Sequence, residues 1–145
     1  WRRARRKRRT TLLYGAATRR ELLRDLAAGA FAACRFATIA GSAGFRGDVV
    51  SLCADLLGRG ALRGSAIYSC GPRGMVHALV ETVGATLGPH YTSLETIMAC
   101  GVGACRGCTV PVREGGGTAL KAICSDGTVF PAGEIAWEEW ASWEK

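Results

Sequence analysis

The sequence MACGVGACRGC, residues 98–108, contains three cysteines and three glycines within eleven residues. A fourth cysteine, Cys124, follows Cys108 after a segment with the pattern of two strands joined by a glycine turn. Three thiolates on one loop and a fourth on a returning hairpin can close around one metal centre. Because residues 89–145 would otherwise have little core, this stretch predicts a small β-rich domain organised by a metal.

The cysteines are spaced C-x4-C-x2-C with a distant fourth, which is the order of plant-type [2Fe–2S] sites. The intervening glycines suit such a site because backbone amides must approach the negatively charged sulfurs closely, and side chains would obstruct that approach. The spacing therefore predicts iron–sulfur ligation by Cys100, Cys105, Cys108 and Cys124.

A structural zinc site with four cysteines is the main alternative, and free thiols are a third. Zinc ligands usually come as two closely spaced pairs, whereas here three cysteines are close and the fourth stands alone. A [2Fe–2S] centre passes single electrons and forms no bond to a substrate. We therefore expect an electron relay rather than a catalyst by itself, and we assign no catalytic residue.

The net charge of +7 is located in the first nine residues, WRRARRKRR. They hold seven of the nineteen Lys and Arg residues, and the rest of the chain balances twelve basic against twelve acidic residues. We interpret residues 1–9 as a solvated basic tail, with a nucleic-acid or lipid contact as the alternative. No apolar run approaches the roughly 18–20 residues that span a bilayer, so we expect no membrane partner. Because we interpret the basic run as a solvated tail, we expect no nucleic-acid partner either.

The total of seven cysteines is odd, which favours free thiols and metal ligands over a disulfide framework. We therefore expect a reducing compartment, the cytoplasm. Three of them, Cys34, Cys53 and Cys70, stand singly in apolar surroundings. We interpret Cys53 as a small core residue.

Residues 10–88 alternate between strand and helix patterns, which predicts a parallel sheet with crossover helices. Thr18 and Glu21 have the spacing of a capping box that would start a helix ending near Gly29. Residues 86–93 look like a linker. The expected strands are 10–15, 34–40 and 65–70, and the further expected helices begin near Val49 and Pro72.

We divide the chain into a basic tail (1–9), a partial NAD-binding α/β domain (10–88) and a cluster domain (89–145). In the last of these we expect a strand over 109–114, a glycine turn over 115–117 and a return strand near 119–124.

The chain resembles the C-terminal part of the electron-transfer subunit of B-type dihydroorotate dehydrogenase, in the ferredoxin reductase superfamily. The resemblance extends over nearly all of the chain beyond the tail, in the family's order. It is carried by YGA (14–16), GSAG (41–44), YSCGPRGM (68–75), SLETIMACGVGACRGC (93–108), Cys124, DGTVF (126–130) and Ile135-Ala-Trp137.

This resemblance implies a two-subunit enzyme of pyrimidine biosynthesis, and hence a hetero-oligomer. A catalytic subunit would oxidise dihydroorotate on FMN. Electrons would then cross the [2Fe–2S] cluster to FAD and leave as hydride to NAD+. Cys100, Cys105, Cys108 and Cys124 match the family's four cluster ligands.

The superfamily's NAD-binding loops lie at the carboxyl ends of parallel strands, where helix N-termini offer amides to phosphates. The residues of this chain at those places are Gly15, Ala16, Gly41, Ser42, Cys70, Gly71, Pro72 and Met75. In the superfamily, the cysteine that corresponds to Cys70 lies beside the nicotinamide. The alternative interpretation of Cys70 is a packed strand residue.

Three features depart from the family pattern. Ala40 stands where an acidic residue usually precedes the glycine, and DGTVF has threonine where proline is usual. The family's FAD-binding β-barrel, together with the first strand and pyrophosphate loop of its nucleotide domain, has no counterpart here. We therefore expect a truncated piece of a longer subunit or a degenerate copy, from which the FAD-binding domain is mostly absent.

Two other functions stay open at this point. One is a zinc-stabilised binding module whose basic arm contacts nucleic acid. The other is the iron–sulfur reductase subunit of another flavoprotein system, such as a sulfide or ferredoxin-dependent NADP reductase.

Overall fold

The structure is a computed structural model that describes residues 10–23, 31–84 and 86–143. The chain forms two compact units, residues 1–61 and 62–145. The basic tail, 1–9, lies outside the described residues.

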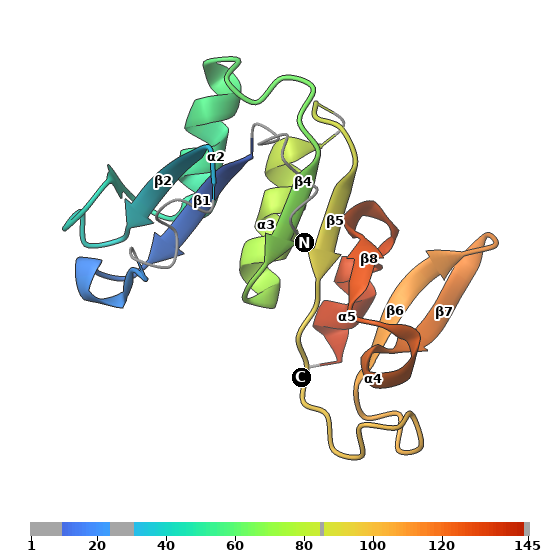
Figure 1. The fold of residues 1–145 in the computed structure, drawn as a ribbon. Helices are drawn as coiled ribbons and strands as arrows, with labels where there is room; N and C mark the ends of the chain where they lie inside the picture. Colours follow the sequence, from blue (N-terminus) through green and yellow to red (C-terminus); the bar gives the residue numbers. More distant parts are fainter. Residues whose placement is uncertain (1–9, 24–30, 85, 144–145) are drawn as a thin grey trace, which may run out of the picture. The chain divides into compact units, whose positions relative to one another are not determined.

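Among the described residues, the first unit is a parallel sheet in the order β1-β2-β3 with the helix α2 packed on it (Figure 1). Tyr14 of β1 lies opposite Phe36 of β2. Asp48 caps the helix by accepting a hydrogen bond from the Ser51 amide at 2.7 Å. The elements are β1 (Thr11–Ala16), a 3-10 turn η1 (Arg19–Glu21), β2 (Ala33–Thr38), β3 (Phe45–Arg46) and α2 (Val49–Gly58).

The helix predicted to start at the Thr18–Glu21 capping box is not an α-helix over its described part. Glu21 does bond the Thr18 hydroxyl, at 2.8 Å, but its second oxygen accepts the amide of Ala17 rather than that of Thr18. Leu22 is already extended, so η1 ends after one turn. Residues 24–30, including the expected stop at Gly29, lie outside the described residues.

The second unit begins with a mixed sheet in the order β4-β5-β8, in which β4 and β5 are parallel and β8 is antiparallel. Its elements are β4 (Ile67–Cys70), α3 (Arg73–Val83), β5 (His90–Ser93) and β8 (Val129–Pro131). The linker predicted over 86–93 is therefore wrong, since its second half is β5. Tyr91 of β5 stacks on Tyr68 of β4, with ring centroids 5.7 Å apart.

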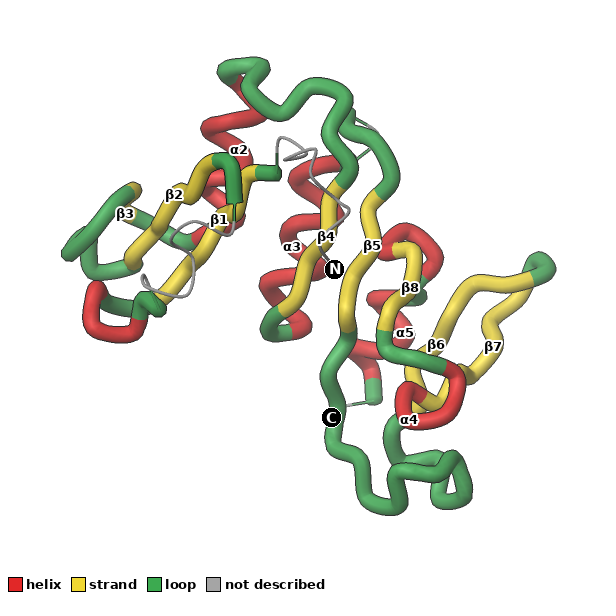
Figure 2. Tube along the Cα trace, viewed as in Figure 1, coloured by secondary structure: helices red, strands yellow, loops and turns green. Residues whose placement is uncertain are grey.

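A long loop leads from β5 to an antiparallel hairpin (Figure 2). Its elements are β6 (Thr109–Glu114), β7 (Gly117–Ala122), α4 (Ile123–Asp126), a 3-10 turn η2 (Ala132–Glu134) and α5 (Trp137–Ser142). The core of the unit gathers fully or largely buried side chains from the hairpin, α3, α4, α5 and the residue that follows η2, among them Val76, Val110, Ile123, Ile135 and Trp137. Trp137 also donates its indole hydrogen to the Ala132 carbonyl at 2.9 Å.

The boundary between the compact units differs from the boundary at 88/89 expected from the sequence. The reason is strand pairing: Ile67–Cys70 pairs with His90–Ser93, and β5 pairs with β8. This sheet joins β4 and α3 to the cysteine-bearing segment. The α/β class with parallel strand pairs is confirmed, and among the described strands β1 and β4 lie in separate sheets.

Candidate metal centre

The four clustered cysteines come from three places in the second unit. Cys100 and Cys105 are exposed on the loop between β5 and β6, and Cys108 is buried directly before β6. Cys124 is half-buried in α4, directly after β7. The hairpin explains the meeting of Cys108 and Cys124: Thr109 lies opposite Ala122, so both cysteines emerge from the same end of it.

The thiols lie in two pairs. The sulfurs of Cys108 and Cys124 are 3.3 Å apart. The Cys105 amide donates to the Cys100 sulfur over 3.4 Å, and the Cys105 thiol also hydrogen-bonds to it. Within the described ranges, no three Cys, His, Asp or Glu side chains converge as ligands of a single metal ion. A centre of two metal ions with two thiolates each is the arrangement that fits this pairing.

Backbone amides point at the sulfurs, as a site for thiolates requires. The Gly103 amide donates to Cys124 over 3.1 Å, and the Gly107 amide donates to Cys105 over 3.4 Å. Amide donors stabilise the charged form of a thiol. The fit to a negatively charged iron–sulfur group therefore rests on both the thiol pairs and the amides around them.

The pKa of Cys100 is lowered to about 6 because its sulfur accepts hydrogen bonds, first from the Cys105 amide and then from the Val102 amide and the Cys105 thiol. At neutral pH this thiol is therefore mostly thiolate, the form that binds metal. The pKa of Cys108 is also lowered, first by a hydrogen bond from the Cys124 backbone and then by the thiol–thiol hydrogen bond between the two residues. The shared hydrogen correspondingly raises the pKa of Cys124.

The short helix that carries Cys124 is fixed by side chains that sequence reasoning missed. Asp126 accepts the Ala122 amide at 2.7 Å, which closes the turn α4. The Ser125 hydroxyl donates to the Ala122 carbonyl at 3.4 Å. The signal in the sequence was DG at 126–127, since Asp readily bonds nearby amides and Gly127 takes the positive φ that ends the turn.

The expected nucleotide residues fall into two sets of four, one in each unit. In the first unit, Gly15 and Ala16 end β1, and Gly41 and Ser42 follow β2. They lie at the carboxyl edge of two adjacent parallel strands, where ligands of α/β proteins bind. Ser42 ties the two loops together by accepting the Arg19 amide at 2.9 Å.

The second set lies where β4 leads into α3: Cys70 ends the strand, Gly71 and Pro72 form the connection, and Met75 lies in the first turn of the helix. Cys70 is exposed and its thiol donates to Glu95 over 3.7 Å, a partner that sequence reasoning missed. Its pKa is raised by partial burial and by the charge of Glu95. Gly71 has φ +151° and lies against Met75, whose methyl carbon would be 2.6 Å from an added Cβ.

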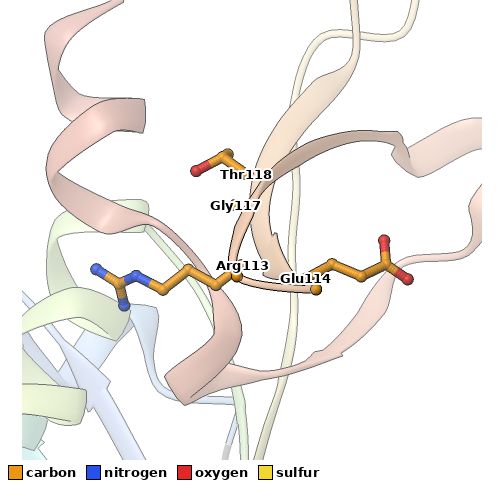
Figure 3. A pocket seen from close by; sticks show the side chains of 6 residues that line it. Arg113, Glu114, Gly117 and Thr118 are labelled. Atoms are coloured by element: carbon orange, nitrogen blue, oxygen red, sulfur yellow. The ribbon is translucent and has the colours of Figure 1, made fainter.

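A hollow at the tip of the hairpin is separate from these residues (Figure 3). It is lined by residues 113–118, and the side chains of Arg113 and Glu114 leave the strand in opposite directions. Arg113 donates to the Ile135 carbonyl, and Glu114 pairs with Lys121 at 2.7 Å. Both charged side chains are thus already partnered. Among the described residues, no helix has the length and apolar character to cross a membrane.

Comparison with known proteins matches the segment that contains the four clustered cysteines. Residues 95–136 match the family described as the iron-sulfur cluster binding domain of dihydroorotate dehydrogenase B. The chain is 40% identical over 121 residues to the dihydroorotate dehydrogenase B (NAD(+)) electron transfer subunit of Geobacillus thermodenitrificans (strain NG80-2), covering 83% of this chain and 44% of that subunit. The resemblance seen in the sequence is confirmed.

Two further relatives agree. The electron transfer subunit of Bacillus caldolyticus is 43% identical over 106 residues, which is 73% of this chain and 38% of that subunit. The solved structure of an NADH-dependent reduced ferredoxin-NADP oxidoreductase matches with a TM-score of 0.62 and 30% identity, over 76% of this chain and 37% of that one. The chain thus spans about two fifths of the length of these relatives.

Proposed function

We propose that this chain is an electron-transfer module that holds a [2Fe–2S] cluster through Cys100, Cys105, Cys108 and Cys124. The observation that carries the proposal is the arrangement of the four thiols as two pairs, within the segment that matches the iron-sulfur domain family. Two irons need two protein ligands each, and the pairs supply them.

A bound cluster would supply one-electron transfer between flavins. The chain's own residues do the rest. Amides of Gly103, Cys105 and Gly107 hold the thiolates, and the burial of Cys108 in the core of its unit keeps water from one side of the site. The exposed Cys100–Cys105 side faces solvent, which leaves it accessible to a redox partner.

We further infer the partners and cofactors from the relatives, which are named as electron transfer subunits of dihydroorotate dehydrogenase B (NAD(+)). Electrons would come from the FMN of a dihydroorotate-oxidising catalytic subunit in a cytoplasmic hetero-oligomer and pass to FAD and NAD+. Contacts to NAD are assigned to Gly15, Ala16, Gly41, Ser42, Cys70, Gly71, Pro72 and Met75.

Residues 10–88 are proposed to be a partial NAD-binding α/β domain, whose sheet lacks a strand that the family has. Within the described strands, β1 pairs with β2 alone and β4 pairs with β5 alone, so each has an open edge. An open edge is what the superfamily resemblance predicts for a strand whose neighbour in the family's sheet has no counterpart here. Residues 89–145 are the cluster domain of this proposal.

The test is elemental and spectroscopic. Anaerobically purified chain should contain iron and acid-labile sulfide in a 1:1 ratio and should be red-brown, bleaching with dithionite. Cys124→Ser should deplete the cluster, whereas Cys53→Ser, at a buried cysteine of α2 in the other unit, should leave the iron content unchanged. A colourless zinc protein, or equal iron loss in both variants, would overturn the proposal.

A further inference from the structure

Arg106 has an unusual backbone for its residue type. It lies between Cys105 and Gly107 with φ +54°, the one non-glycine residue of the described ranges with a positive φ. Side chains other than glycine, asparagine and aspartate seldom adopt this left-handed conformation, because Cβ crowds the backbone. Something in the fold must therefore hold this residue in place.

The side chain of Arg106 provides that restraint. Its guanidinium donates to the Leu120 carbonyl over 3.1 Å. Leu120 lies in β7 opposite Pro111, and because the Pro111 carbonyl points away from β7, toward the Ala136 amide, these two residues exchange no hydrogen bond across the hairpin. The Leu120 carbonyl therefore faces the outer edge of β7, where Arg106 gives it a donor that β6 does not supply.

The two outer edges of the hairpin are closed by different segments. On β6, the Ala136 amide donates to the Pro111 carbonyl at 3.0 Å. On β7, Arg106 brings the cysteine loop back to the strand. This contact joins the segment that carries Cys105 and Cys108 to the strand that leads into Cys124, and it uses no cysteine atom.

We propose that Arg106 is a positioning residue for the cluster, a clamp that fixes the Cys105–Cys108 segment on the edge of β7. The inference rests on the proposed [2Fe–2S] ligation. With the clamp in place, the loop is ordered before iron binds, so less conformational entropy is lost on loading and the ligands separate less easily afterwards.

The experiment compares Arg106→Leu with Arg113→Leu in the loaded chain. Arg113 is a matched control because its guanidinium also donates to a backbone carbonyl, that of Ile135, over 3.3 Å and in the same hairpin. We expect iron release to a chelator to be about tenfold faster in Arg106→Leu, with a broadened EPR signal of the reduced cluster. Arg113→Leu should match wild type, and Arg106→Lys should recover part of the loss.

A glycine variant separates the side chain from the backbone. Arg106→Gly relieves the steric strain of the left-handed conformation but also removes the clamp. We therefore expect this variant to lose iron as fast as Arg106→Leu. Wild-type iron retention in Arg106→Gly or Arg106→Leu would overturn the proposal.

A second readout does not need iron. In the reduced, metal-free chain, alkylation of the buried Cys108 thiol should be several-fold faster in Arg106→Leu than in wild type or Arg113→Leu. Equal alkylation rates in all three would refute the clamp. Absence of iron from wild type together with this rate difference would refute the ligand assignment alone.

Discussion

Gly101 and Gly103, two residues of the cysteine loop, share a left-handed backbone but not their surroundings. Their φ angles are +72° and +79°. A Cβ on Gly101 would meet no atom within 4 Å, whereas one on Gly103 would come within 2.8 Å of the Ser125 hydroxyl oxygen. Gly103 also donates its amide to Cys124, so its backbone cannot move away without weakening that bond.

These two positions allow a paired substitution. Gly101→Ala should cost roughly 1–2 kcal/mol of unfolding free energy from backbone strain alone. Gly103→Ala should cost more, and it should also lower the iron content, because the clash with Ser125 displaces the amide from the Cys124 sulfur. Thermal unfolding and iron analysis of both variants check this. Equal behaviour would mean that contact with Ser125 has no role.

At the level of single residues, the sequence predicts which four cysteines are the proposed ligands but not the contacts that surround them. The spacing of Cys100, Cys105, Cys108 and Cys124 follows from loop chemistry and could be read directly. The contacts of Arg106 with Leu120 and of Cys70 with Glu95 join residues 14 and 25 positions apart. No local pattern encodes such pairs, because they depend on how β6, β7 and β5 are placed.

Among the helices, α2 has a cap whose strength depends on pH. The pKa of the Asp48 carboxyl is lowered, mainly because the Ser51 amide donates to it. The folded form therefore favours the carboxylate. The stabilisation is fully present above the carboxyl pKa of the unfolded chain, about 3.9, and is lost as pH falls through the lower pKa of the folded chain.

Replacing this cap gives a prediction at the scale of one helix. Asp48→Ala should lower the free energy of unfolding by about 1 kcal/mol at neutral pH, the usual value of an N-cap. Asp48→Asn keeps the acceptor, so it should be close to wild type at neutral pH and should lose the part of the acid dependence that belongs to Asp48. Denaturant titrations at pH 7 and pH 3 measure both effects. An Asp48→Ala chain as stable as wild type would contradict the role of the cap.

The elements that sequence patterns predicted best are those with local signals. The strands at β1, β2, β4 and β6 and the helices α2 and α3 have apolar periodicity of their own, and each lies within a few residues of its expected range. β5 was missed because HYTS is four residues long and follows Gly88-Pro89, a typical loop signal. It becomes a strand through pairing with β4 and β8, which lie far from it in the sequence.

At the scale of the whole chain, the two units have separate buried residues. Ala37, Thr38, Leu52 and Cys53 are buried in the first unit. In the second, Cys108 is itself part of the core cluster, and Cys124 packs against it. The proposed cluster is therefore tied to the core of one unit, and its removal should act on that unit first.

Hydrogen exchange on the loaded and the iron-depleted chain tests this coupling. Removing iron should speed exchange of the Val110 and Ile123 amides, because Cys108 and Cys124 lose the metal that joins β6 to α4. Exchange at Ala37 and Leu52 should stay unchanged. In the loaded Cys53→Ser chain, exchange should be faster at Ala37 and Leu52 and unchanged at Val110 and Ile123, because the altered side chain is buried in the first unit. A uniform rise of the exchange rates in both units on iron removal would mean that the chain unfolds as one cooperative body, and it would contradict this prediction.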